Sequence, residues 1–420
     1  SPVSLDPAQR PPDFIAHQVV DPSTGQVFES GEAIAGGRLT VKLFKAGTTE
    51  RIGDAKVTLI GPTLASGTST SALDLTLQPL KPGSYQVRVE APGYATILTN
   101  PVTLDATNPT TVQYELSPSA GDVTGRALDG SGNPLVGAWV NVDDAYAFTD
   151  SNGAFRLKGA PIGSQTVAVA KTGFAPAAVT TTLSSGETSL GDVRLTARER
   201  SVYLQNAAQP FGGSAVGTAL GALTTALQGD GFTLQTTAND PAIRIIASPT
   251  ASSIGDVAAT AESLRSFVAA GGKLVLLGEW GGFADYDPDT LNRLAQPYGI
   301  AFNPDLIRLS GTHPSWIQIP AVGSALPAPT PVSSGIELFE SSSLLAPAPA
   351  VPVASTGSGG FRVSALLNGD FVVAAARPYG RGLVVAVGDT SAWVTPATQG
   401  GASNLDVSSN RAFILDLLRW

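Results

Sequence analysis

The 420-residue sequence contains no cysteine and no methionine, and it has only two histidines. Without cysteine, the chain has no disulfide framework and no thiol nucleophile. A chain without an initiator methionine is expected to have been trimmed, and a cysteine-free, lysine-poor composition favours an exported bacterial protein. We therefore expect the protein at the cell surface, in the periplasm or outside the cell. One version of this expectation places a lipid-bearing cysteine before Ser1.

Clusters of positive charge and long apolar runs are also missing. The net charge is −9 at pH 7 and no group of lysines and arginines stands out, so nucleic acid is not expected as a partner. The most apolar stretches, 371–376 and 383–387, are only as long as strands. A spanning helix needs ~18–20 apolar residues, so no transmembrane segment is predicted.

Short alternating strands dominate the first half of the chain. Runs such as RLTVKLF (38–44) and TTVQYEL (110–116) alternate polar and apolar residues between turn-forming residues. This alternation predicts antiparallel sheets with one face in water. We expect an extended tail at 1–13, a first β-sandwich at 14–118 and a second at 119–197.

The second predicted β-domain echoes the first. GSYQVRVEAPGY (83–94) and GSQTVAVAKTGF (163–174) share Gly, Ser, two alternating valines, Gly and a terminal aromatic residue, at an offset of 80 residues. Upstream, DAKVTL (54–59) corresponds to GAWVNV (137–142). The offset exceeds the ~20–50 residues of stacked repeats, so two tandem β-sandwiches are predicted and not a solenoid.

An ordered series of turn and core residues marks the second β-domain. It consists of Gly125, Pro134, Leu135, Gly137, Ala138, Thr149, Asp150, Gly153, Phe155, Gly163, Gly173 and Phe174. With this series, residues 121–195 resemble the carboxypeptidase regulatory-like domain, a small transthyretin-like sandwich. The resemblance implies an accessory domain of secreted and surface proteins without a catalytic group. The more divergent first β-domain is expected to be immunoglobulin-like or carboxypeptidase regulatory-like.

The pattern changes at about residue 198. Apolar strands such as KLVLLG (273–278) alternate with helical stripes at 213–229 and 257–268, and the chain ends in a hairpin followed by a helix. Strands that are apolar throughout, alternating with helices, indicate a mainly parallel sheet covered on both faces. We expect one α/β domain over 198–420.

Four segments of this α/β region occur in a recognisable order: GGKLVLLGEW (271–280), LNRLAQPYGIAF (291–302), RPYGRGLVVAVGDTSAW (377–393) and NRAFILDLLRW (410–420). The region resembles a divergent branch of the class I glutamine amidotransferase-like family, which implies a flavodoxin-like fold. The expected fold class is thus two tandem antiparallel β-sandwiches followed by a flavodoxin-like, amidotransferase-like α/β domain with a mainly parallel sheet.

Residues 278–282, GEWGG, have the spacing of a nucleophile elbow. The resemblance implies that an active amidotransferase carries cysteine where this chain has Trp280. Indole cannot attack a carbonyl, so the nucleophile is missing. A shifted register could use Thr390 or Ser391 with His313 as the base, but no GxSxG surrounds them, and the other histidine, His17, belongs to a different domain. We therefore predict no catalytic residue and no enzymatic activity.

Glu279, Trp280 and Asp389 form the candidate ligand-binding site. They follow two strands of the predicted parallel sheet, and ligands of open α/β sheets bind at the carboxyl ends of strands. Two carboxylates beside an indole would suit a sugar or a small polar ligand. The favoured alternative is structural: Glu279 and Asp389 cap the segments that follow them, and Trp280 fills the site.

Asp285, Asp287 and Asp289 are the only candidates for a metal site, with Ca²⁺ as the ion. The run lacks the glycine and the closing glutamate of an EF-hand loop. We favour capping, with Asp287 preceding a helix that begins at Pro288 and Asp289 near its positive end. No cofactor is therefore expected.

Gly212, Gly213, Gly217 and Gly221 follow the first strand of the α/β region. They match neither GxGxxG nor a P-loop, so close packing of a helix on the sheet is favoured over a phosphate cradle.

The resulting hypothesis is a non-enzymatic, exported protein of the cell envelope that acts as a binding or scaffolding subunit. Its expected partners are other envelope or surface-layer proteins, with glycan as a further candidate. One alternative is a surface hydrolase of glycans or peptides that uses Glu279 and Asp389, whose carboxyl groups would then lie about 5–9 Å apart. Another is a carbohydrate-binding protein that depends on Trp280.

Overall fold

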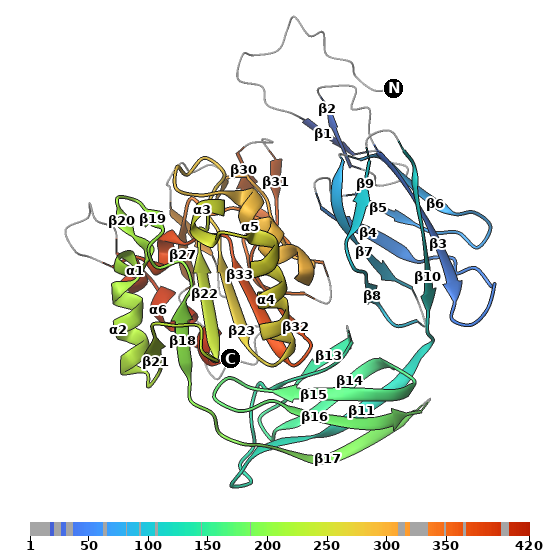
Figure 1. Cartoon of the computed structure of the whole chain (residues 1–420), viewed down its shortest axis with the longest axis horizontal. Coiled ribbons are helices and arrows are strands. Elements are labelled where there is room, and N and C mark those ends of the chain that lie inside the picture. The colour runs from blue at the N-terminus through green and yellow to red at the C-terminus, as the bar shows by residue number, and fades with distance from the viewer. Residues whose placement is uncertain are drawn as a thin grey trace, which may run out of the picture.

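The computed structural model arranges the chain in two β-domains and one larger α/β domain (Figure 1). It describes residues 17–20, 27–30, 37–61, 65–80, 82–91, 94–105, 108–143, 145–184, 186–309, 316–319, 335–347, 350–363, 367–395 and 403–420. The predicted tail at 1–13 and His313 lie outside these residues. His17 belongs to β1 (His17–Val20), which pairs with β2 (Val27–Ser30).

The first β-domain packs two sheets around one core. Its strands are β3 (Gly37–Lys45), β4 (Lys56–Ile60), β5 (Ala65–Thr68), β6 (Leu75–Leu80), β7 (Gly83–Glu90), β8 (Ile97–Leu98), β9 (Val102–Leu104) and β10 (Thr110–Leu116). One sheet has the order β10-β3-β6; the other has the order β5-β4-β7-β8, with β9 also paired to β7. Alternate residues such as Val57, Val87 and Val89 fill the space between the sheets, as the period of two predicts.

The second β-domain repeats this topology, with the single strand β16 in the place of β8 and β9. Its strands are β11 (Ser119–Asp129), β12 (Trp139–Val142), β13 (Ala145–Phe148), β14 (Ala154–Pro161), β15 (Gly163–Ala170), β16 (Ala177–Leu183) and β17 (Glu187–Leu195). Their orders, β14-β11-β17 and β13-β12-β15-β16, match those of the first domain when β11 is placed on β3 and β15 on β7. The repeat found in the sequence is therefore a repeat of the fold.

One feature of the β-domains differs from expectation. Strand β10 runs parallel to β3, and β17 runs parallel to β11, so each sandwich contains one parallel pair. The alternation of polar and apolar residues predicts which side chains face the core. It carries no information on which strands pair or in which direction, so the antiparallel expectation was wrong for these two pairs.

The α/β domain is built on a seven-stranded sheet with the order β21-β18-β22-β23-β33-β32-β29. Its strands are β18 (Ser201–Leu204), β21 (Thr233–Gln235), β22 (Ile243–Ala247), β23 (Lys273–Leu277), β29 (Val351–Ser355), β32 (Val372–Tyr379) and β33 (Gly382–Val387). The first five strands of this order are parallel, and β32 and β29 are antiparallel to their neighbours. The turn between β32 and β33 lies at Gly380 and Arg381, where the sequence predicts it.

Helices cover both faces of this sheet (Figure 1). They are α1 (Val216–Ala219), α2 (Gly221–Gly229), α3 (Ala251–Ile254), α4 (Val257–Ala269), α5 (Pro288–Ala295) and α6 (Asn410–Arg419). Along β23, Leu274 and Leu276 join the core under α4 and α5, whereas Val275 and Leu277 join the core under α2 and α6. Both faces are buried, which explains why this strand is apolar throughout. Among the described residues, no helix is long and apolar enough to cross a membrane.

Shorter elements complete the α/β domain. The strands are β19 (Pro210–Phe211), β20 (Ser214–Ala215), β24 (Ala301–Phe302), β25 (Ile307–Leu309), β26 (Trp316–Ile319), β27 (Ile336–Phe339), β28 (Leu344–Leu345), β30 (Gly360–Arg362) and β31 (Leu367–Gly369). The 3₁₀ segments are η2 (Gln296–Tyr298), η3 (Gly357–Gly359), η4 (Ser391–Trp393) and η5 (Asn404–Asp406).

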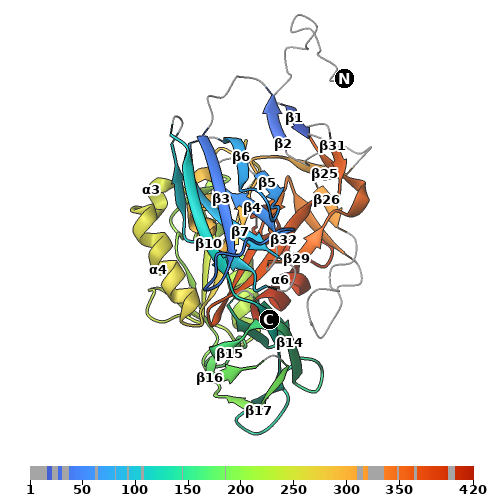
Figure 2. The same ribbon diagram turned by 90° about the vertical axis from the view of Figure 1, so that its right-hand side faces the viewer.

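Both β-domains contact the α/β domain through the outer face of one sheet. It is the sheet of β7 in the first domain and the sheet of β15 in the second, the two strands that carry the repeated sequence. From β12 and β15, Trp139 and Ala170 enter the α/β core, although they belong to the second β-domain. From β7, Gln86 donates to the carbonyl of Pro297 at 3.5 Å, and Gln296 donates to the carbonyl of Ser84 at 3.0 Å. Figure 2 shows the second β-domain below the α/β domain, next to the C-terminal helix.

Lys273 is a buried lysine at the junction with the second β-domain, where burial and then the charge of Lys171 lower its pKa well below the ordinary value. Its side chain is 2% exposed, and Nζ donates to the carbonyls of Leu417, Leu418 and Trp420 at 2.9, 3.0 and 2.7 Å. These carbonyls belong to the end of α6, where a helix leaves its acceptors unpaired and favours positive charge. Thr172 of the second β-domain donates to the same Trp420 carbonyl at 2.5 Å, so the lysine holds the helix end that this domain contacts.

We expect Lys273→Met to lower the free energy of unfolding by about 2–4 kcal/mol, because three buried carbonyl oxygens lose their donor. Urea unfolding followed by circular dichroism measures the change. Lys56→Met, at an exposed lysine, is the control and should change stability by less than ~0.5 kcal/mol. Equal stabilities of the two variants would contradict this role of Lys273.

Candidate functional site

Polar residues follow three adjacent parallel strands at their carboxyl ends: Ser248 after β22, Glu279 after β23 and Asp389 after β33. This is the edge at which the sequence predicts a ligand site. However, Ser248 and Asp389 are 0% exposed and Glu279 is 1% exposed. The carboxyl pair thus lies in the interior of the domain, in a corner where Thr390 and Ser391 are also buried.

Asp389 holds the loops around it through backbone amides. Its Oδ1 accepts from the N–H of Ser391 at 2.6 Å and of Ala392 at 3.3 Å, and its Oδ2 accepts from the N–H of Phe339 at 2.5 Å. The first two bonds cap η4, as the structural interpretation of Asp389 requires. The third attaches β27 to the end of β33.

Glu279 does not cap a turn. Its Oε2 accepts from the hydroxyl of Ser391 at 2.9 Å, and its Oε1 is buried without a hydrogen-bond partner in the described part of the chain. The hydroxyl of Thr390 donates to the carbonyl of Gly278 at 2.8 Å and lies 2.8 Å from the hydroxyl of Ser248. Both hydroxyls that a shifted nucleophile would use are therefore engaged in holding the corner together.

Burial controls the protonation of the pair. It raises the pKa of Glu279 well above its ordinary value, and the nearby charge of Asp389 raises it further. Burial also raises the pKa of Asp389, to about 7, against the opposing effect of the backbone N–H of Phe339. At neutral pH, Asp389 is therefore partly ionised, and Glu279 keeps its proton to a higher pH than an exposed glutamate does.

Trp280 does not share this corner. It is half-buried, and its ring lies over Gly282, where an added Cβ would meet the indole at 1.9 Å. A nucleophile elbow needs a helix directly after the strand, but α5 begins only at Pro288. The GEWGG spacing therefore does not form an elbow, and glycine at 282 serves to accommodate the indole.

Two of the three aspartates of the calcium candidate accept hydrogen bonds from backbone amides, and the third, Asp289, lies in the first turn of α5. Asp287 caps α5, accepting from the N–H of Asp289 and of Thr290 at 3.1 Å each, and Pro288 follows it. Asp285 accepts from the N–H of Gly212 at 3.0 Å. Within the described residues, no three His, Cys, Asp or Glu side chains are grouped so that they could hold a metal ion.

The glycines after β18 serve different purposes from the one expected. Gly212 and Gly213 have φ of 54° and 87° and form the turn between β19 and β20, while an added Cβ at Gly221 would meet nothing within 4 Å. Of the four, only Gly217 is closely packed, because an added Cβ there would lie 3.2 Å from Ala207. The expectation of close helix packing was wrong for the other three, because a glycine-rich string does not reveal which glycine needs positive φ.

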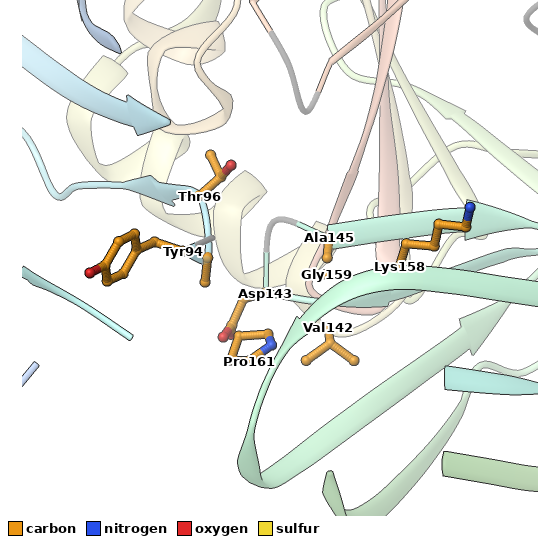
Figure 3. A pocket seen from close by; sticks show the side chains of 9 residues that line it. Tyr94, Thr96, Val142, Asp143, Ala145, Lys158, Gly159 and Pro161 are labelled. Atoms are coloured by element: carbon orange, nitrogen blue, oxygen red, sulfur yellow. The ribbon is translucent and has the colours of Figure 1, made fainter. Parts of the chain in front are cut away.

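Two adjoining cavities lie instead where the domains meet. The larger has a volume of about 570 Å³ and takes lining residues from all three domains, including Thr96, Asn141 and Tyr379. The smaller, of about 220 Å³, lies between the β-domains; in Figure 3, Tyr94 and Thr96 stand on one side and Asp143 and Pro161 on the other. We call the larger cavity the junction cleft. Sequence analysis missed it, because its walls come from three separately predicted domains.

Two protein-family models match parts of the chain. The carboxypeptidase regulatory-like domain matches residues 122–196, and the PEGA domain matches residues 70–120. The first match confirms the resemblance of the second β-domain, and the second falls within the first β-domain. Neither match reaches the α/β domain, and comparison with curated proteins finds no match.

Solved structures show only distant similarity. The mmIFT52 N-terminal domain is 19% identical, with a TM-score of 0.38, over 52% of this chain and 96% of its own. A streptococcal ancillary pilin is 16% identical, with a TM-score of 0.21, over 41% of this chain and 65% of its own. The minor pilin GBS52 of Streptococcus agalactiae is 13% identical, with a TM-score of 0.22, over 39% of this chain and 97% of its own. These scores establish neither a common overall fold nor a common function.

The carboxyl pair predicts a specific dependence of stability on pH. Because the pKa values of the pair are raised in the folded protein, its contribution to the free energy of unfolding is fully present below the ordinary aspartate pKa of 3.8. This contribution is lost as pH rises through about 7. Glu279→Gln keeps an acceptor for Ser391 but cannot ionise. We expect a flatter decline of unfolding free energy from pH 4 to 8, with the variant about 1–2 kcal/mol more stable than the parent at pH 8.

Urea unfolding at several pH values measures this difference. Glu199→Gln, at an exposed glutamate, is the control and should follow the parent at every pH. If the Glu279→Gln profile were as steep as that of the parent, the raised pKa of the pair would be wrong.

Proposed function

We propose that this chain is a non-enzymatic, exported binding or scaffolding subunit of the bacterial cell envelope. The observation that carries the proposal is the enclosure of Glu279 and Asp389, which are 1% and 0% exposed. A hydrolase that used these carboxyl groups would need substrate and water to reach them. Here the hydroxyl of Ser391 occupies one oxygen of Glu279, and three backbone amides occupy Asp389.

The α/β domain is, in this proposal, a degenerate amidotransferase-like domain. Its five parallel strands, numbered 1 to 5 along the chain, are β18, β21, β22, β23 and β33. Across the sheet they lie in the order 2-1-3-4-5. This is the flavodoxin-like order of a doubly wound sheet, which supports the family resemblance. Such a domain without a cysteine has lost the nucleophile that the resemblance implies, and its sheet now provides a rigid support for the β-domains.

The second β-domain supports a location outside the cytoplasm. The carboxypeptidase regulatory-like match covers 122–196, and the resemblance implies an accessory domain of secreted and surface proteins. The partners proposed are other proteins of the envelope or surface layer, together with envelope glycan.

Amine labelling tests the location. A membrane-impermeant lysine reagent, applied to cells that produce the protein, should label the exposed Lys56 and Lys158 without rupture of the cytoplasmic membrane. Lys273, which is 2% exposed, should stay unlabelled and reports that the protein is folded. Labelling of Lys56 only after cell lysis would place the protein in the cytoplasm and overturn the proposed location.

A second experiment tests the absence of catalysis. We expect the purified chain to release no product from panels of chromogenic glycosides, esters and peptide amides beyond that of an Asp389→Asn variant, because neither carboxyl group is accessible. Turnover that Asp389→Asn or Glu279→Gln abolishes would support the alternative of a surface hydrolase.

A further inference from the structure

The junction cleft takes its walls from three domains. One wall is the outer face of the β12 and β15 strands, where Asn141 and Ala168 are direct cross-strand neighbours. Residues 95–98 of the first β-domain and the 378–381 turn of the α/β domain form the other walls. The side-chain amide of Asn141 donates to the carbonyl of Gly380 at 2.7 Å and so ties the first wall to the turn.

The lining mixes apolar and polar surface and has no dominant charge. Nine of the sixteen residues around the cleft have polar side chains, among them two acids, Glu115 and Asp143, and one base, Arg381. The adjoining cavity adds Lys158, which balances the acids. A chain with a net charge of −9 thus presents two acids and two bases here, an arrangement that does not select a polyanion or a polycation.

Asn141 belongs to the walls of the cleft and is enclosed by them. It is 3% exposed, its amide nitrogen donates to the carbonyl of Gly380, and its Oδ1 is buried. A ligand would therefore meet the more exposed polar groups of the lining. Thr96 and Gln165, both half-buried, add further donors and acceptors to the lining.

The apolar part of the lining comes mostly from small or cyclic residues, such as Ala95, Pro161 and Ala168. The one aromatic ring in the lining, that of Tyr379, packs against Tyr298 with centroids 5.1 Å apart and has the guanidinium of Arg377 over it. Small apolar patches beside amides and hydroxyls suit a molecule with apolar C–H faces and many hydroxyl groups.

We propose that the junction cleft binds a neutral oligosaccharide, which makes envelope glycan the ligand of the binding function proposed above, on which this inference rests. The cleft volume of about 570 Å³ lies in the range of sites for small ligands. The ligand would contact all three domains at once, because Thr96, Gln165 and Tyr379 belong to different ones.

Calorimetry and an oligosaccharide array with the full chain test the proposal. The probes are cello-, xylo-, manno- and chito-oligosaccharides, acidic galacturonan oligomers and a library of extended peptides. We expect at least one neutral series to bind. The Gln165→Ala/Thr96→Ala double variant should bind it at least tenfold more weakly, since two hydrogen bonds are lost. The control, Gln113→Ala/Thr111→Ala, changes the same residue types at exposed positions of β10 and should bind like the parent.

The remaining outcomes separate the glycan site from the proposed envelope function. Binding to no neutral oligosaccharide, binding only to acidic oligomers or peptides, or equal affinity of both double variants would overturn the glycan site while leaving the envelope function intact. Mass spectrometry of the probe after incubation separates the two proposals further. Cleaved probe would overturn the non-enzymatic function, whereas intact probe with cleft-dependent binding supports both.

Discussion

The structure depends on the burial of a second sheet face in each β-domain. A small β-sandwich usually buries the inner faces of its sheets and leaves the outer faces in water. Here the outer faces of the β7 and β15 sheets pack on the α/β domain, and Trp139 becomes part of the α/β core. Lys273 completes this contact by holding the end of α6 against the second β-domain. The second β-domain is therefore joined to the α/β domain by core packing and the first by hydrogen bonds, and the junction cleft lies where the three domains meet.

A second burial, within the α/β domain, explains why its polar corner is structural. At the carboxyl ends of its strands, an open α/β sheet usually leaves a crevice. In this chain, β27 and η4 close over that edge, and the amides of Phe339 and Ser391 bind Asp389 there. Polar groups remain in the corner because each holds a loop. The two cavities described above lie instead at the boundaries between domains.

Sequence reasoning succeeded where a local pattern has one structural solution. The apolar strand at β23, the helix cap at Asp287 and the repeat that relates β7 to β15 were all predicted from residues close together in the chain. It failed where the outcome depends on distant segments. The parallel pairing of β3 with β10 joins strands about 70 residues apart, and Gly282 is needed for the ring of Trp280 and not for an elbow. Spacing alone cannot show whether a helix follows a strand at once or after a loop.

The sequence by itself determined the division into β-rich and α/β regions, the parallel and doubly covered character of the last sheet, and the lack of a thiol nucleophile. These follow from composition and from periods of two or 3.6 residues, which are local properties of the chain. Only the tertiary structure decided that Glu279 and Asp389 share a closed corner and that Thr96, Asn141 and Tyr379 line one cleft. Burial and shared cavities arise when segments far apart in the chain pack together, and no local pattern encodes how three domains meet.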